Sequence, residues 1–243
     1  MARGRRIHSV TPTFGSKEFA LSTQTAPLVA SPKYPCPMSQ RPIDTLCAAL
    51  QSEFDSDPSG GGIPSLLIAY QAKHSDWNDW AMWSEGRYTR NLVSRRDSFE
   101  LLLLCWSPGT QSPIHDHAGQ NCWMAVLEGG LEEVYYSQPK DADDNDQVLV
   151  ERGLAKSYAE GEVAAIDDSI AYHLTQPVGD ARAVSMHLYA KAIDSCRTFC
   201  PETGPSENMA LGYHSVRGEL VGDTPAETIR DRFSLSASGA LRC

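Results

Sequence analysis

Two histidines separated by one residue are the clearest candidates for chemistry in this sequence. His115 and His117 lie in the segment Ser-Pro-Ile-His-Asp-His, and Cys122 follows five residues later. Because side chains two apart on a β-strand point to the same face, these imidazoles can share one metal ion without distortion of the backbone. A solvated loop with inert histidines is the alternative, and it would suffice for a single histidine. The pair therefore predicts a metal site.

Two further histidines occur downstream in strand-like contexts. His173 follows a segment that starts at Gly161, and His187 alternates with Ser185 and Tyr189 between apolar positions. This alternation is typical of a strand that lines a polar site on one face. A hydrogen-bonded structural histidine is the alternative for His187. The alternation of side chains along a strand does not decide whether His173 or His187 is a third metal ligand.

Composition and charge exclude several classes of protein. The chain has 243 residues, of which 41% are hydrophobic and 21% charged, as in a globular protein. A formal net charge of −10 argues against nucleic-acid binding, and the short apolar runs argue against a membrane span. Seven cysteines, an odd number at low density, favour reduced thiols in an intracellular protein. We expect a cytoplasmic monomer.

The first 40 residues differ from the remainder of the chain. They contain five basic residues and one acidic residue, are rich in Ser, Thr and Pro, and have little apolar periodicity. Three interpretations fit them: an organellar transit peptide, a disordered tail, or an upstream extension before a true start at Met38. We expect residues 1–40 to be a disordered basic extension and residues 41–243 to form one domain. No role is assigned to the sequence after about residue 217.

Hydrophobic periodicity changes from helical to strand-like along the chain. Apolar residues from Ile43 to Phe54 form one helical stripe, a second short helix is expected over 64–74, and tryptophans from Trp77 to Trp83 suggest a third helical turn. After Gly86 the pattern predicts many short strands and hence an all-β barrel or sandwich with an N-terminal helical cap. The strands are expected at 88–94, 99–106, 122–128, 131–137, 147–151, 162–166, 170–175, 181–189 and 208–215.

Several motifs, taken together, resemble a known family. The glycines at 109 and 129 frame the His-x-His pair as in the first motif of a cupin barrel, with Cys122 in the position of the usual glutamate. Over residues 42–216 the order and spacing of motifs resemble the cysteine dioxygenases, a thiol dioxygenase family of the cupin superfamily. The motifs are Tyr88-Thr-Arg-Asn-Leu-Val, Leu104-Cys-Trp, Ile114-His-Asp-His with Cys122, Ile166-Asp-Asp-Ser-Ile-Ala-Tyr-His, and Ser185-Met-His-Leu-Tyr.

The resemblance implies a fold and a metal. It implies an all-β cupin (jelly-roll) barrel that holds one Fe(2+) per chain through His115, His117 and His173. It places His187 outside the metal sphere, as a partner of other site residues. Three neutral imidazoles leave the ion its full positive charge, which suits a thiolate as an incoming ligand.

The resemblance also implies a substrate. In the family, an arginine at the position of Arg90 binds the substrate carboxylate, whereas related thiol dioxygenases can carry glutamine there. A guanidinium offers a rigid fork for a carboxylate, and Tyr88 on the same strand face would orient it. An exposed salt bridge is the ordinary alternative for a single arginine. Arginine favours L-cysteine over 3-mercaptopropionate.

The remaining site residues are a thiol, a phenol and an imidazole. Cys122 and Tyr189 match a pair that in animal members of the family is joined by a thioether; a buried thiol and a hydrogen-bonded phenol are the alternative. We expect Tyr189 to orient substrate or oxygen, and His187 to hydrogen-bond to that phenol. The implied reaction adds O₂ to the sulfur of L-cysteine. Dioxygenation of 3-mercaptopropionate or cysteamine, a Zn or Mn cupin, and a non-enzymatic metal-binding cupin are the alternatives.

Overall fold

The computed structural model describes residues 41–137, 151–200 and 206–226, and every structural statement below concerns this part of the chain. The predicted disordered extension, residues 1–40, lies outside it, as do residues 147–150 of one expected strand. The division into an extension and one domain stays a prediction.

Three helical segments precede the strands, as the apolar periodicity predicts. They are α1 (Pro42–Ser56), α2 (Ile63–Gln71) and the 3-10 helix η1 (Asp76–Trp80). The apolar stripe of α1 is buried along its whole length, from Ile43 to Phe54. Proline lies in the first turn of both α-helices, where its missing N–H leaves no hydrogen bond unmade. The third turn is shorter than expected, because it ends before Trp83.

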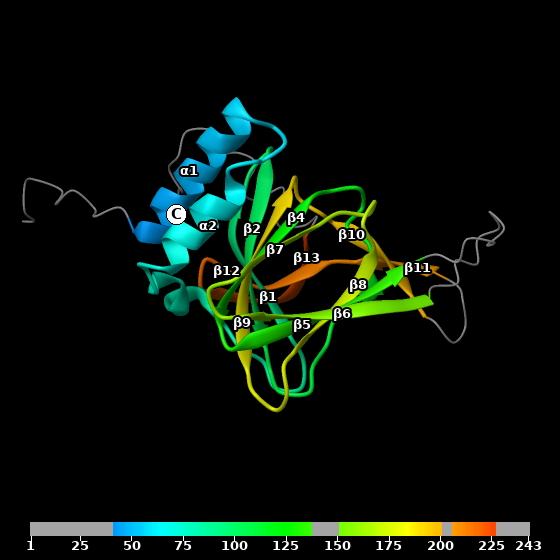
Figure 1. Ribbon diagram of the computed structural model, residues 1–243. Coiled ribbons are helices and arrows are strands. Elements are labelled where there is room, and N and C mark those ends of the chain that lie inside the picture. Colours follow the sequence, from blue (N-terminus) through cyan, green and yellow to red (C-terminus); the bar gives the residue numbers. More distant parts are fainter. Residues whose placement is uncertain (1–40, 138–150, 201–205, 227–243) are drawn as a thin grey trace, which may run out of the picture. The chain divides into compact units, whose positions relative to one another are not determined.

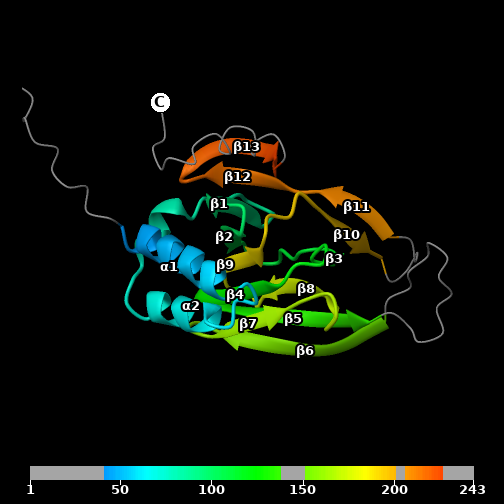
Figure 2. The same ribbon diagram turned by 90° about the horizontal axis from the view of Figure 1, so that it is seen from above.

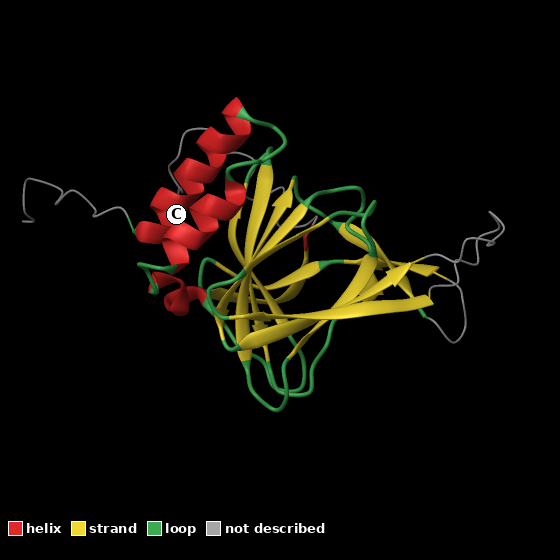
Figure 3. Cartoon of the chain, in the orientation of Figure 1, coloured by secondary structure: helices red, strands yellow, loops and turns green. Residues whose placement is uncertain are grey.

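The strands form two sheets, one antiparallel throughout and the other antiparallel except for the parallel pair β1 and β12. The seven-stranded sheet has the order β13-β12-β1-β2-β9-β4-β7, and the six-stranded sheet has the order β11-β10-β3-β8-β5-β6. The strands are β1 (Thr89–Arg95), β2 (Phe99–Trp106), β3 (Ile114–His115), β4 (Cys122–Glu128), β5 (Gly130–Ser137), β6 (Glu151–Ala159), β7 (Val163–Ile166), β8 (Tyr172–Pro177), β9 (Ala183–Ala190), β10 (Ser195–Phe199), β11 (Ser206–Ala210), β12 (Gly212–Val216) and β13 (Glu219–Pro225). The predicted all-β architecture with an N-terminal helical cap is confirmed (Figure 3).

The central strands β2, β9 and β4 of the seven-stranded sheet are buried on both faces. In β9, Val184, Met186 and Leu188 belong to one apolar cluster, which also contains the buried residues of the helices. Tyr189, on the opposite face, belongs to a second cluster that lines the interior of the barrel. Figures 1 and 2 show α1 and α2 side by side next to this sheet. The helices therefore complete one core, and the opposite face of the sheet is left for the site.

Strand β1 contains a bulge that the sequence pattern did not reveal. Its pairing with β2 shifts between Leu92 and Ser94, so that Arg90 lies opposite Leu104 and Arg95 lies opposite Glu100. Leu104 and Glu100 are an even number of residues apart and point to one face of β2. Arg90 and Arg95, an odd number apart, therefore share a face because of the bulge.

The remaining differences concern short or polar strands. The segment expected at 208–215 is two strands, β11 and β12, separated at Leu211. Strands β10 and β13 and the two-residue strand β3 lie outside the expected strand segments, and β6 extends much further than the segment that the sequence indicated. Strand β13 pairs with β12, so residues 219–225, to which the sequence analysis gave no role, extend the sheet.

Candidate metal centre

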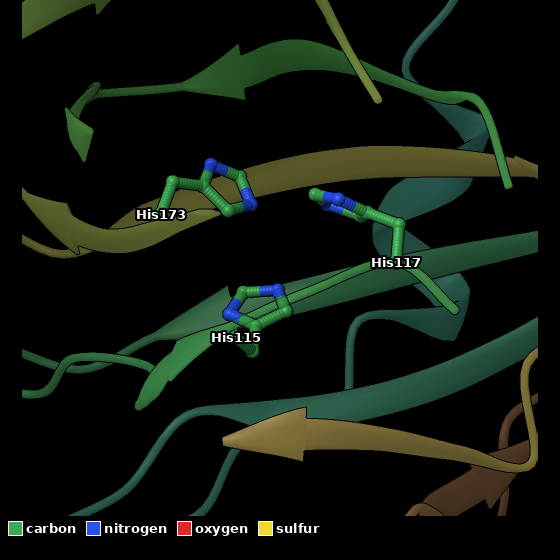
Figure 4. A group of neighbouring side chains, drawn as sticks. All are labelled: His115, His117 and His173. Atoms are coloured by element: carbon green, nitrogen blue, oxygen red, sulfur yellow. The ribbon is translucent and has the colours of Figure 1, made fainter. Parts of the chain in front are cut away.

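Three histidines from two separate segments lie close together. His115 ends β3 and lies directly opposite His173 of β8, while His117 lies two residues further along the chain. One ring nitrogen from each histidine can be chosen so that all three lie within 4.8 Å of one another. Figure 4 shows the three rings gathered around a common point. The structure thus brings His173, and not His187, together with the His-x-His pair.

The surroundings of each imidazole favour one nitrogen for a metal. Nδ1 of His115 lies 2.9 Å from the carbonyl oxygen of Pro113. A carbonyl can only accept, so Nδ1 carries the proton and Nε2 presents its lone pair. In the other two rings Nδ1 lies near a carboxylate: 3.3 Å from Asp168 Oδ1 in His117, and 3.4 Å from Glu133 Oε1 in His173. Such outer contacts are typical of metal-binding histidines.

The segment that carries His117 is clamped by Asp168. This carboxylate accepts the backbone N–H of His117 and the backbone N–H of Gly119, each at 2.6 Å. Between and after these contacts the backbone is left-handed, with φ of 50° at Ala118 and 76° at Gly119. A left-handed alanine costs about 1 kcal/mol, which the two charge-assisted hydrogen bonds can offset.

The donor set fits a metal ion. Nε2 of His117 is buried without a hydrogen-bond partner among the described residues. Buried polar atoms normally have partners, and a cation would satisfy a free ring nitrogen. Burial and the neighbouring imidazoles hold the pKa of His115 well below 6.5; burial also lowers the pKa of His173. Neutral imidazoles are the form that binds a metal.

A pocket next to this group is lined by the residues expected to bind substrate. Arg90, Tyr88 and Tyr189 form part of its wall together with His115 and His187. Tyr88 is stacked on Trp106, with 4.8 Å between the ring centres, and it precedes the first residue of β1. The remainder of the wall is mostly apolar: Leu104, Ile193, Met209 and Leu211.

Arg90 reaches this pocket with one donor to spare. Its side chain is 11% exposed, and its Nε is buried without a hydrogen-bond partner among the described residues. Burial alone would lower the pKa of Arg90, but the neighbouring Tyr189 and Glu100 more than offset this and raise it. The guanidinium is therefore charged and incompletely bonded, which is the condition of a binding group for an anion.

Cys122 and Tyr189 lie directly opposite each other on β4 and β9. Both side chains are buried, and burial raises the pKa of each above its ordinary value. They are therefore a neutral thiol and a neutral phenol at neutral pH in this protein without metal.

His187 differs from the expectation. We predicted a hydrogen bond from His187 to the phenol of Tyr189, but both of its ring nitrogens contact other residues. Nε2 lies 2.9 Å from Ser185 Oγ, and Nδ1 lies 3.9 Å from Cys122 Sγ. The ring centres of His187 and Tyr189 are 6.2 Å apart. The strand alternation correctly predicted the face of the sheet on which His187 lies. It did not predict the hydrogen-bond partner, because the side-chain rotamer decides which neighbour the ring reaches.

Three residues near the site have no counterpart in the sequence predictions: Glu133, Asp168 and Glu100. Each is a carboxylate that contacts a predicted site residue, namely His173, His117 and Arg90. The alternation in β5 could have placed Glu133 on a buried face, but its partner lies on another strand. Asp168 reaches His117 from a turn, and Glu100 reaches Arg90 across the pairing of β2 with β1.

Comparisons with known proteins agree with these observations. The family model described as cysteine dioxygenase type I matches residues 45–202. Cysteine dioxygenase type 1 of Rattus norvegicus is 34% identical over 158 residues, which cover 64% of this chain and 77% of the rat protein. The Danio rerio protein of the same name is 33% identical over 185 residues, or 75% and 90% of the two chains.

One similar solved structure is a distant match. A conserved protein with a double-stranded beta-helix domain from Klebsiella pneumoniae covers 56% of this chain and 96% of its own, with 15% identity and a TM-score of 0.37. In the described part of the chain, no helix is long and apolar enough to cross a membrane.

Proposed function

Because this chain belongs to the cysteine dioxygenase family of the cupin superfamily, we propose that it adds both atoms of O₂ to the sulfur of L-cysteine and releases cysteine sulfinate. The observation that carries the proposal is the three-histidine group beside a pocket that contains an arginine. The thiol supplies all the electrons that O₂ takes up, so no separate reductant is needed. The proton of the thiol is released to water with the ionised product.

The proposed cofactor is one Fe(2+) per chain, held by His115, His117 and His173. The metal fits the donor set, because the three imidazoles are held neutral by burial or lie beside carboxylates. When bound, iron would supply the one-electron chemistry that O₂ needs to react with a thiolate. Nδ1 of His115 stays protonated against the carbonyl of Pro113, so its ring keeps one orientation.

Arg90 is proposed to bind the carboxylate of the substrate. A carboxylate would satisfy the buried Nε and accept a second hydrogen bond from the same planar group. The stacked rings of Tyr88 and Trp106 form an adjoining wall that limits the position of the ligand. A carboxylate held here directs the thiol of a small amino acid toward the histidines and away from bulk water.

Tyr189, Cys122 and His187 are proposed to act on the bound thiol and oxygen. The phenol of Tyr189 can donate a hydrogen bond to either, because burial keeps it protonated. Its direct opposition to Cys122 supports a thioether between the two residues. His187 lies between Ser185 and Cys122 and would hold the Cys122 side chain in one position.

The test is oxygen uptake by iron-reconstituted protein with L-cysteine, with sulfinate quantified in the same sample. We expect one sulfinate for each O₂ consumed. Rates of oxygen uptake with cysteamine and 3-mercaptopropionate, measured in parallel, show which thiol is the preferred substrate. Tightly bound Zn or Mn without thiol-dependent oxygen uptake would refute the proposed dioxygenase activity.

The role of Arg90 is tested separately. Arg90→Ala should raise KM for L-cysteine by roughly a hundredfold, because a bidentate charged pair in a pocket is worth about 3 kcal/mol. Cysteamine, which lacks a carboxylate, serves as the control substrate. Its KM should rise much less in this variant. Kinetics of the variant equal to those of the unaltered protein would remove Arg90 from the site.

A further inference from the structure

A fully buried carboxylate lies behind Arg90. The side chain of Glu100 in β2 is 0% exposed, and its Oε2 lies 3.5 Å from the terminal nitrogen NH2 of Arg90. Glutamate is rarely buried completely unless it is paired. Nothing in the metal centre or in the pocket wall requires it, since it lines neither. Its burial therefore indicates a role through its neighbours.

The two oxygens of Glu100 have unequal surroundings. Oε1 receives a hydrogen bond from the hydroxyl of Tyr213 and lies 3.1 Å from NH1 of Arg95. Arg95 is itself held by Asp194, at 2.6 Å. Oε2 contacts Arg90, so the carboxylate is anchored through one oxygen and directs the other to the pocket arginine.

The sheet places this carboxylate in line with the site. Glu100 pairs with Arg95 across one neighbouring strand and with Tyr189 across the other. Tyr189 in turn pairs with Cys122, so the four residues form one row on the inner face. Arg90 pairs with Leu104, which shares the face of Glu100 on β2, and its guanidinium lies 5.9 Å from the centre of the Tyr189 ring.

We propose that Glu100 is a positioning residue that holds the guanidinium of Arg90 toward the pocket and thereby sets the preference for thiols that carry a carboxylate. The inference rests on the proposed function, in which Arg90 binds that carboxylate. Asp194 and Glu100 together balance the charges of Arg95 and Arg90, so the attraction for an anion depends on where the Arg90 guanidinium is held. Without Glu100 the two guanidinium groups would repel each other from the same buried face.

The first test is Glu100→Gln in iron-loaded protein. The change keeps the shape of the side chain but removes the charge that attracts Arg90. We expect KM for L-cysteine, and its Kd measured without oxygen by calorimetry, to rise by about tenfold, the effect of one buried charged contact. The kcat for L-cysteine should change less than KM, and the Kd of cysteamine should change by less than about twofold, because that thiol has no carboxylate for Arg90.

A second variant keeps the proposal testable if Glu100→Gln does not fold. Tyr213→Phe removes only the hydroxyl that anchors Oε1 and should shift the Kd of L-cysteine in the same direction by a smaller factor. Ser215→Ala is the matched control, since it removes another buried hydroxyl of β12 that bonds to Asn91 and not to Glu100. The control should leave the ratio of the two thiol affinities unchanged. Urea denaturation of each variant reports its stability.

Equal losses of affinity for L-cysteine and cysteamine in Glu100→Gln and Tyr213→Phe would overturn the proposal and leave Glu100 a structural residue. Unchanged affinity for both thiols in both variants would overturn it as well. Failure of the proposed function is recognised separately, in the unaltered protein, as iron binding without thiol-dependent oxygen uptake. That result removes the substrate role of Arg90 and the inference about Glu100 with it.

Discussion

Glu133 offers a test of how a carboxylate in contact with a histidine affects the affinity of the proposed centre for metal. Its side chain is 1% exposed in β5, and Oε1 lies 3.4 Å from Nδ1 of His173. The other oxygen accepts the hydroxyl of Tyr135 at 2.7 Å. Glu133→Gln keeps an oxygen for that hydroxyl and removes the negative charge beside the imidazole. The proposed metal ligand would then be less basic and less firmly oriented.

The expected loss of metal affinity follows from this geometry. Replacement of a residue that orients a metal-binding histidine typically weakens binding by about ten- to a hundredfold. The contact of 3.4 Å exceeds the usual length of a charge-assisted hydrogen bond, so we expect the lower end, about tenfold or about 1.4 kcal/mol.

The assay is competition for Fe(2+) against a chelator of known affinity, in the absence of oxygen. Glu132→Gln is the control, because the neighbouring carboxylate contacts Nε2 of Gln176 at 2.9 Å and not a histidine. Metal affinity of Glu133→Gln equal to that of the unaltered protein would refute the argument, as would equal weakening by both substitutions. Thermal unfolding without metal shows whether either change disturbs the fold.

Three further outcomes are expected. His173→Ala should lose bound metal and oxygen uptake together. Metal content is measured by atomic absorption, and one metal ion per chain in this variant would contradict the assignment of His173 as a ligand. Burial lowers the pKa of His187 from 6.5 to about 3, so the unfolded chain takes up this proton first and the folded protein loses stability as the pH falls below 6.5. Between pH 7 and pH 5 this histidine should cost about 2 kcal/mol, and urea denaturation of His187→Asn should show a pH dependence smaller by that amount. Leu50→Ala, in the fully buried stripe of α1, should reduce the free energy of unfolding by about 2–5 kcal/mol in the same assay, and a loss under about 1 kcal/mol would show that the helices contribute little to the core.

Much of the fold follows from apolar periodicity. The bounds predicted for 99–106 and 122–128 are those of β2 and β4, because both strands are apolar runs with clear ends. The polar strands β10 and β13 lack this signal, since one or both of their faces are exposed. These segments are strands because they pair with neighbouring strands, and a single sequence does not show that pairing.

The site could be predicted only in part. The spacing of His115 and His117 indicated a metal site, but the third histidine required either the family resemblance or the pairing of His115 with His173. The carboxylates behind the site were missed because each reaches its partner across strands or a turn. Arg95 was missed for another reason: simple alternation from Arg90 places it on the wrong face, and only the bulge corrects this.

The clamp by Asp168 also has a consequence for motion. A loop with a left-handed alanine and a glycine would ordinarily open often, and each opening would carry His117 away from the other two rings. Here the side chain of Asp168, on a distant turn, accepts hydrogen bonds from both His117 and Gly119, so departure of this carboxylate frees both amide hydrogens for exchange with solvent. Opening of the loop and departure of Asp168 are thereby one event. One of the three histidines is thus held in place by a carboxylate that is not itself a member of the group.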